Sequence, residues 1–227
     1  MSESRVARRK ARTAQAILDA AENLFRERGF HAVRVEEIAD AADVAVGSIY
    51  GYFGDKLGLY QALAERSMDV FAGYMAQAYD PSLRPLEQVI AGGDAYLRFH
   101  LDHPGAFRLL VAPAPGATDG GEIGARIAAR MEEILDGFAD VIRQAIDAGE
   151  AQEVDPRTLT RFLWGAWNGV VDLTTRPDRL RLSDAEVADA LHLGRRIVLE
   201  GLAAPTLRDR AGKLVGVRIA TIAPPGL

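Results

Sequence analysis

Two short helical segments stand in tandem within residues 35–56, and they constrain the fold more than any other feature of the sequence. In the first segment, Val35, Ile38 and Ala42 recur at the spacing of one buried helical stripe. Residues 41–44 are too small and polar to continue this stripe, so we expect the chain to turn there. Two short helices joined by a break of this length indicate a helix-turn-helix.

The second helix of the pair is expected to begin near Ala45 and to direct small and hydroxyl-bearing residues outward. Its inner face carries Ile49 and Phe53, four residues apart. A helix that is held at a fixed angle by its neighbour and is small on its outer face fits the major groove of DNA. The positions that we predict to approach DNA here are Val46, Gly47, Ser48, Tyr50, Gly51, Tyr52 and the following Lys56.

An amphipathic helix is predicted ahead of this pair, from Thr13 to Gly29. Thr13 has the side chain of an N-cap, and Gly29 suits a left-handed C-cap with Phe30 folding back on the last turn. Three helices of this kind bury one small core. The apolar stripe that supports the prediction consists of Ile17, Ala20, Ala21, Leu24 and Phe25.

The order of these elements resembles the tetracycline-repressor (TetR) family. The resemblance is dense over residues 13–56 and diffuse beyond them. It implies an all-α fold with a helix-turn-helix domain at residues 1–56, a helical ligand-binding and dimerisation domain at 57–204, and a tail at 205–227. The residues that match the family signature are Phe25, Gly29, Ile38, Ala39, Gly47, Tyr50, Tyr52, Phe53 and Lys56.

Several positions depart from the family pattern. Val33 and Arg34 stand where members usually carry Thr or Ser before the second helix, and Asp43 stands where they carry Gly in the turn. Ala45 and Val46 replace a Ser-Lys pair at the start of the recognition helix, and Gly51 replaces a large polar residue. Losing groove contacts changes the DNA sequence that is read, or weakens DNA binding altogether.

Charge is distributed unevenly around the predicted helix-turn-helix. The chain has a formal net charge of -5, which argues against a general binder of polyanions. Residues 1–12 nevertheless hold five cations against one anion, whereas residues 13–56 hold four cations against eight anions. We therefore expect Arg8, Arg9 and Lys10 of this amino-terminal arm, together with Arg34, to neutralise phosphates. The alternative is a disordered, solubilising arm.

Composition excludes several other classes of protein. The 227 residues contain no cysteine, so neither a disulfide nor a thiolate metal site can form. The four histidines lack metal-ligand spacing with a carboxylate pair, and no catalytic or nucleotide-binding motif is present, so we expect neither an enzyme nor a cofactor. No stretch has the length and apolarity of a signal peptide core or a membrane span, which predicts a cytoplasmic protein without a membrane partner.

Helix follows helix after Lys56. We predict helices over residues 55–79, 85–103, about 107–112, 119–149, 156–175 and 184–204, with Asp155 and a Ser183–Glu186 capping box starting the last two. Near the end only KLVGVRIATI alternates like a strand, a pattern compatible with either an ordered hairpin arm or a floppy tail.

The last two predicted helices are the candidate dimer surface. The resemblance implies that such helices pair with a second copy as a four-helix bundle, which sets two recognition helices about one DNA turn apart on a palindromic operator. The alternative is that their apolar stripes pack only inward. The predicted interface residues are Phe162, Leu163, Ala166, Val170, Val187, Leu191, Val198 and Leu202.

The middle helices are expected to enclose a cavity for a small effector that is mostly apolar or aromatic, because large adaptable side chains are abundant there. Some relatives carry His where this chain has Asn168, which argues against an imidazole contact to the ligand. The alternative is that these residues form an ordinary core. The predicted ligand residues are Met68, Phe71, Tyr74, Met75, Tyr96, Phe99, Phe107, Met131, Trp164, Trp167, Asn168 and Asp172.

These observations predict a ligand-responsive, DNA-binding transcriptional regulator, a homodimeric repressor that a small effector releases from its operator. The acidic helical unit and Val46 leave one alternative open. It is a dimeric small-molecule binder, descended from a repressor, that binds DNA weakly or without specificity.

Overall fold

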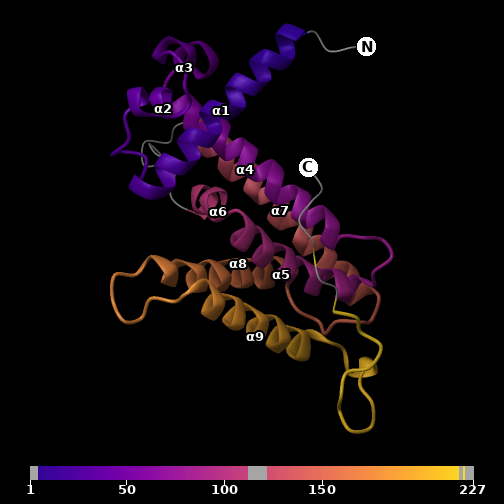
Figure 1. The fold of residues 1–227 in the computed structure, drawn as a ribbon. Helices are drawn as coiled ribbons and strands as arrows, with labels where there is room; N and C mark the ends of the chain where they lie inside the picture. Colours follow the sequence, from indigo (N-terminus) through magenta and orange to yellow (C-terminus); the bar gives the residue numbers. More distant parts are fainter. Residues whose placement is uncertain (1–4, 112–121, 220–221, 223–227) are drawn as a thin grey trace. The chain divides into compact units, whose positions relative to one another are not determined.

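The computed structural model describes residues 5–111, 122–219 and 222 (Figure 1). Over these residues the chain forms nine α-helices, two short 3-10 helices and no β-strand, which confirms the predicted all-α fold. The α-helices are α1 Arg5–Arg28, α2 Val35–Ala41, α3 Val46–Phe53, α4 Lys56–Ala78, α5 Pro85–Asp102, α6 Pro104–Val111, α7 Glu122–Asp147, α8 Pro156–Asp172 and α9 Asp184–Leu202. The 3-10 helices are Leu173–Thr175 and Pro205–Leu207.

The chain divides into two compact units. Unit 1 comprises Met1–Asp69 and His103–Ala129, and unit 2 comprises Val70–Asp102 and Arg130–Leu227. The division differs from the predicted domains at 1–56 and 57–204. The first turns of α4, the whole of α6 and the start of α7 belong to unit 1, because the core of the first three helices extends onto α4.

Helix α1 begins eight residues earlier than predicted, at Arg5. Thr13 is therefore not an N-cap, and its hydroxyl donates to the backbone oxygen of Arg9 within the helix at 3.1 Å. Residues 5–12 contain only Arg, Val, Ala and Lys, mostly strong helix formers without a breaker. At the other end Gly29 has φ +77° and its N–H donates to Phe25 at 2.9 Å, which confirms the predicted left-handed cap.

The core of unit 1 fixes the angle between α2 and α3. Ile17 of α1, Ile38 of α2 and Ile49 of α3 are fully buried together, with Leu59 and Leu63 of α4 beneath them. Burying each of these side chains stabilises the unit by about 1.5–3 kcal/mol relative to exposure. The inward-facing residues that the helical spacing predicted are therefore the ones that hold the helix-turn-helix together.

The turn between α2 and α3 explains one departure from the family pattern. Asp43 occupies the place of the usual Gly and adopts φ +53°, the left-handed conformation that Asp tolerates better than most residues. Neither the N-cap of α2, Arg34, nor that of α3, Ala45, carries a capping hydroxyl. This loss is compensated only at α2, where the backbone N–H of Arg34 donates to Glu37 Oε2 at 2.8 Å. At α3 the N-cap Ala45 makes no side-chain bond.

In unit 2, helix α5 packs against α9, and α8 packs against α9. The predicted caps of the last two helices are confirmed. Asp155 accepts from the N–H of Thr158 at 2.7 Å, and Ser183 and Glu186 form a reciprocal capping box. The predicted start of the helix over 119–149 lies outside the described residues.

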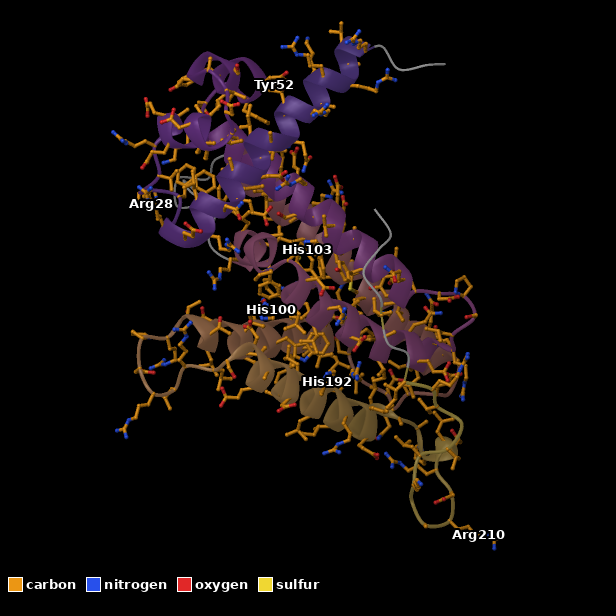
Figure 2. The ribbon with its side chains drawn as sticks, in the orientation of Figure 1. Arg28, Tyr52, His100, His103, His192 and Arg210 are labelled. Atoms are coloured by element: carbon orange, nitrogen blue, oxygen red, sulfur yellow. The ribbon has the colours of Figure 1, made fainter. Side chains whose placement is uncertain are left out.

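The chain after α9 is ordered over its described part. A turn brings Arg208 opposite Leu214 as an isolated antiparallel bridge, and the following residues run extended without forming a strand. The tip of this turn carries Arg210 (Figure 2). Among the described helices, none has the length and apolarity needed to cross a membrane.

Candidate functional site

The outer face of α3 is small and open. Tyr50 and Tyr52 are exposed, and Figure 2 shows Tyr52 beside α3. A Cβ atom added at Gly47 or Gly51 would meet no atom within 4 Å, so none of the described residues covers these positions. Ser48 is half-buried beside them. Val46 packs partly against the core of unit 1, so its side chain is only half-presented to the outside.

An arginine-lined groove runs along the first turns of α1. It has a volume of about 1050 Å³, and its other wall is the turn between α2 and α3. The spacing of its arginines places all four on one helical face. Lys10 and Arg34 are exposed but do not line it. The groove residues are Arg5, Val6, Arg8, Arg9, Arg12, Thr13, Ala16, Ala42, Asp43 and Val44.

Lys56 follows α3 and is partly held by an aromatic ring. Its ammonium lies 4.4 Å from the centroid of the Phe30 ring, a cation–π arrangement. Burial lowers the pKa of Lys56. The side chain therefore has one partner inside unit 1 and is half-exposed on the remaining side.

Part of the negative charge of residues 13–56 is paired with arginines within unit 1. Arg66 of α4 contacts both Asp19 and Glu22 of α1, each at 2.6 Å. Arg28 contacts Glu37 at 2.8 Å, and this hydrogen bond lowers the pKa of Glu37 to about 2. Arg66 had no motif around it in the sequence, so its role as a bridge was not predicted. The cationic face of α1 is formed by the four arginines that line the groove, Arg5, Arg8, Arg9 and Arg12.

Unit 2 contains a small cavity between α4, α5, α7 and α8. Its volume is about 30 Å³, and its walls are almost entirely apolar. The Tyr96 and Trp167 rings lie 5.3 Å apart between centroids and form part of one wall. The lining residues are Phe71, Met75, Gly92, Tyr96, Ile134, Leu135, Phe138, Thr160, Leu163, Trp164 and Trp167.

Five of the predicted ligand residues come together in this cavity: Phe71, Met75, Tyr96, Trp164 and Trp167. The others do not line it. Met68 and Phe107 are core residues of unit 1, whereas Tyr74, Phe99 and Met131 are buried elsewhere in unit 2. Asn168 accepts a hydrogen bond from Tyr96, and Asp172 is exposed at the end of α8. Helical periodicity identifies an inward face but does not say which inward residues border a space.

Gly92 and Thr160 are two of the lining residues that were not predicted as ligand residues. A Cβ atom at Gly92 would lie 2.6 Å from the Phe138 ring, so this mid-helix glycine lets the ring approach α5. The hydroxyl of Thr160 is buried and has no hydrogen-bond partner among the described residues. It is therefore a polar atom in an apolar wall, where the only other hydroxyl, that of Tyr96, already bonds Asn168. For Gly92, the sequence signal that could have found it is a glycine in the interior of a helix.

The predicted dimer stripe splits into two faces. Leu163, Val187, Leu191 and Leu202 are buried inside the protomer, so these four do not lie on a free surface. Successive residues of a helix are rotated by about 100°, so Phe162 faces outward although the next residue, Leu163, is buried. Val170 and Val198 are half-buried. The exposed face of α8 and α9 carries Phe162, Gly165, Ala166, Gly169, Leu193 and Ile197.

Among the described residues, no three His, Asp or Glu side chains are grouped as metal ligands. Three labelled histidines belong to separate places in the chain, His100 in α5, His103 after it and His192 in α9 (Figure 2). Their arrangement offers no metal centre in the described part of the chain.

Comparison with known proteins places both parts of the chain in one family. Residues 17–63 match the family of bacterial regulatory proteins, tetR family, and residues 89–194 match the tetracyclin repressor-like C-terminal domain. The HTH-type transcriptional regulator RutR of Escherichia coli (strain K12) is 26% identical over 202 residues, which cover 83% of this chain and 89% of RutR.

Two solved structures share the fold. AibR in complex with isovaleryl coenzyme A and operator DNA matches with a TM-score of 0.62 and 25% identity, covering 79% of this chain and 95% of that one. The ketosteroid transcriptional regulator KstR2 of Mycobacterium tuberculosis matches with a TM-score of 0.65 and 22% identity, covering 89% and 97% of the two chains. With its helix-turn-helix, its helical second unit and these matches, the chain belongs to the TetR family of bacterial transcriptional regulators.

Proposed function

We propose that this regulator is a homodimeric repressor that leaves a palindromic operator when a small, mostly apolar molecule enters the cavity of unit 2. The observation that carries the proposal is the arginine-lined groove of α1, which borders the turn leading into the open face of α3. One unit thus combines a cationic wall for phosphates with a small helix face for a groove of DNA.

The proposed DNA contacts divide by chemistry. Arg8 and Arg9, which line the groove, would neutralise phosphates of the DNA. Two further exposed cations, Lys10 of α1 and Arg34 just before α2, would do the same. The hydroxyls of Tyr50 and Tyr52, together with Lys56, would position α3 on the sugar-phosphate backbone of DNA. Gly47, Ser48, Gly51 and part of Val46 would then lie against the base edges. The relative AibR was solved with operator DNA.

The proposed effector follows from the cavity walls. A volume of about 30 Å³ is far below the roughly 300 Å³ of an ordinary ligand site, so binding requires the lining side chains to move apart. Unbranched Met75 and the aromatic side chains around it make this feasible, and apolar walls select an apolar or aromatic ligand. The hydroxyl of Thr160 would meet one polar atom of the ligand. AibR, for comparison, was solved with isovaleryl coenzyme A.

The proposed dimer uses the exposed face of α8 and α9. Phe162 and Ile197 are 67% and 61% exposed, which is unusual for such large apolar side chains. The exposed face of α8 also carries Gly165, Ala166 and Gly169, whose small size would let a second helix approach closely. A two-fold pair of this kind would present two α3 helices to successive half-sites of DNA.

A second candidate function is that of a dimeric binder of small molecules without specific DNA recognition. It is favoured by one observation, that Val46–Phe53 contains no charged or amide side chain to pair with bases. Both candidates share the fold and the cavity, so they differ only in DNA binding.

The test is selection of genomic DNA fragments by the purified protein, followed by fluorescence anisotropy with the best fragment. We expect affinity at least a thousandfold above that for random DNA at moderate salt. We also expect that a saturating ligand, found by thermal-shift screening, weakens operator binding by roughly 5- to 150-fold. Equal affinity for selected and random fragments would favour the second candidate, and unchanged affinity with bound ligand would remove the effector mechanism.

A further inference from the structure

The last described part of the chain, residues 214–219 and Ile222, lies along α5, and we call it the C-terminal strap (Figure 1). Three of its contacts are made by its backbone. The N–H of Arg218 donates to Glu87 Oε1 at 2.7 Å, and the N–H of Ile222 donates to Asp94 Oδ2 at 2.7 Å. In return, the Arg84 guanidinium donates to the backbone oxygen of Gly216 at 2.9 Å.

The two carboxylates that receive the strap are buried. Glu87 is 2% exposed and Asp94 is 3% exposed. They stand seven residues apart on α5, about two helical turns, and so share one face of the helix. A buried carboxylate is costly unless its oxygens accept hydrogen bonds, so each one requires the donors that surround it. The strap supplies one of these donors to each carboxylate.

Asp94 connects the strap to the wall of the cavity. Its other oxygen accepts from the Arg195 guanidinium of α9 at 2.5 Å. A Cβ atom at the adjacent Gly93 would lie 2.9 Å from the Trp167 ring and 3.6 Å from Arg195 Cδ, so both side chains press on α5 at this point. Gly92 and Trp167 line the cavity. The strap, Asp94, Arg195 and Trp167 therefore form one continuous set of contacts.

We propose that the C-terminal strap controls access to the cavity, because its hydrogen bond to Asp94 keeps Arg195 and Trp167 seated on α5. Release of the strap leaves an oxygen of Asp94 without its donor. Water or a rearranged Arg195 then takes that place, and Trp167 loses the neighbour that holds it over Gly93. The inference rests on the proposed function only in taking this cavity as the effector site. The strap thus acts as a gate that the effector must displace.

The chain contains its own reporter for this proposal. Both of its tryptophans, Trp164 and Trp167, line the cavity, so intrinsic fluorescence reports on this site alone. Acrylamide quenching of the fluorescence measures how far small molecules reach them. The full-length variant Ile222→Pro removes the N–H that Asp94 accepts, and Ile222→Ala keeps that N–H while shortening the buried side chain. Ile219→Pro is the control, a proline at an exposed strap position.

Release of the strap is measured separately by the rate of tryptic cleavage after Arg218. We expect Ile222→Pro to be cleaved faster and to show a quenching constant raised roughly twofold or more, with Ile222→Ala closer to the wild type. Ile219→Pro should match the wild type in quenching. Trypsin does not cut an Arg–Pro bond, so the cleavage rate after Arg218 is compared only among the wild type and the two Ile222 variants. Any variant that is cleaved faster but is quenched like the wild type overturns the proposal. If no variant is cleaved faster, deletion of residues 214–227 decides by the same quenching criterion, with circular dichroism to verify the helices.

Neither the quenching nor the cleavage measurement uses operator DNA or an effector. The strap proposal and the proposed repressor function can therefore be rejected independently. Wild-type quenching in a strap-free chain that still binds its operator rejects the gate and leaves the regulator intact. Increased quenching in a chain that selects no genomic fragment rejects the repressor and leaves the gate intact.

Discussion

The hydroxyl of Tyr96 on α5 donates a hydrogen bond to the side-chain oxygen of Asn168 on α8, directly beside the cavity. Asn168 occupies the place where some TetR-family proteins carry histidine. Because an amide does not titrate near neutral pH, this contact keeps the same donor and acceptor over the physiological range. Burial raises the pKa of Tyr96, which keeps its proton in place as the donor.

Replacing Tyr96 with Phe should reduce the free energy of unfolding by about 1–2 kcal/mol, because Asn168 then lacks its donor. Tyr79→Phe is the matched control. The Tyr79 hydroxyl is buried without a partner among the described residues, so its removal should be neutral or stabilising. Urea denaturation of the two variants measures the difference. Equal losses would show that the Tyr96 bond contributes nothing.

Replacing Gly92 with Ala should shrink the cavity, because the new Cβ would lie 2.6 Å from the Phe138 ring and force it to move. We expect loss of effector binding with dimerisation and operator binding retained. Gly137→Ala serves as the control on α7, where a Cβ meets nothing within 4 Å. It should stabilise the helix by about 0.5–1 kcal/mol and leave ligand binding unchanged. Isothermal titration calorimetry with the ligand found by thermal-shift screening compares ligand affinity in the Gly92→Ala and Gly137→Ala variants.

Replacing Arg66 with Ala should lower the free energy of unfolding by about 1–3 kcal/mol, because Asp19 and Glu22 lose their shared partner. The unpaired carboxylates should also weaken DNA binding through repulsion of phosphates. Arg26→Ala removes an exposed contact of 3.7 Å to Glu27 and should have little effect. If the two variants unfold alike, the Arg66 bridge is not a significant interaction.

The pair of Glu37 with Arg28 should give unit 1 a defined acid sensitivity. The pKa of Glu37 is lowered from 4.5 to about 2, first by the hydrogen bond from Arg28, so the ionised form is favoured by folding. The resulting stability is present above pH 4.5 and is lost as the pH falls towards 2. Glu37→Gln and Arg28→Ala should each reduce the change in the free energy of unfolding between pH 2 and 4.5. A wild-type slope in either variant, measured by urea denaturation between pH 2 and 6, would contradict the assignment.

Replacing Phe162 or Ile197 with Glu should produce a folded monomer, because both side chains are exposed in the protomer and belong to the proposed interface. Leu163→Asp should instead unfold the protein, since Leu163 is 2% exposed and lines the cavity. Leu180→Glu, in the loop between α8 and α9, is the control for an exposed apolar residue elsewhere. Light scattering gives the mass of each. A wild-type protein that is monomeric at micromolar concentration would reject the dimer.

The helices were largely predictable from the sequence, because their periodicity and caps are local. Asp155, Ser183 and Gly29 cap helices as the patterns indicate. The start of α1 was misplaced because a capping hydroxyl such as that of Thr13 also occurs inside helices, where it bonds the preceding turn.

The sites were less predictable because they depend on contacts between distant parts of the chain. Phe162 and Leu163 are adjacent and equally apolar, yet one is exposed and the other lines a cavity. Similarly, Arg66 lies more than 40 residues from the carboxylates it bridges. The strap is a further case, because backbone donors at Arg218 and Ile222 leave no trace in side-chain patterns.

The open face of α3 has a consequence for the number of genes that one such protein can control. Each bidentate pairing with a base supplies about 1–3 kcal/mol of discrimination, and Val46–Phe53 has no side chain able to form one. Discrimination must then come from close approach of the glycines and from groove width and bending, which vary gradually between DNA sequences. If the chain recognises DNA and responds to an effector as proposed, it ranks its sites along a continuum. Promoters with several mismatches would then still be occupied, each released at its own effector concentration.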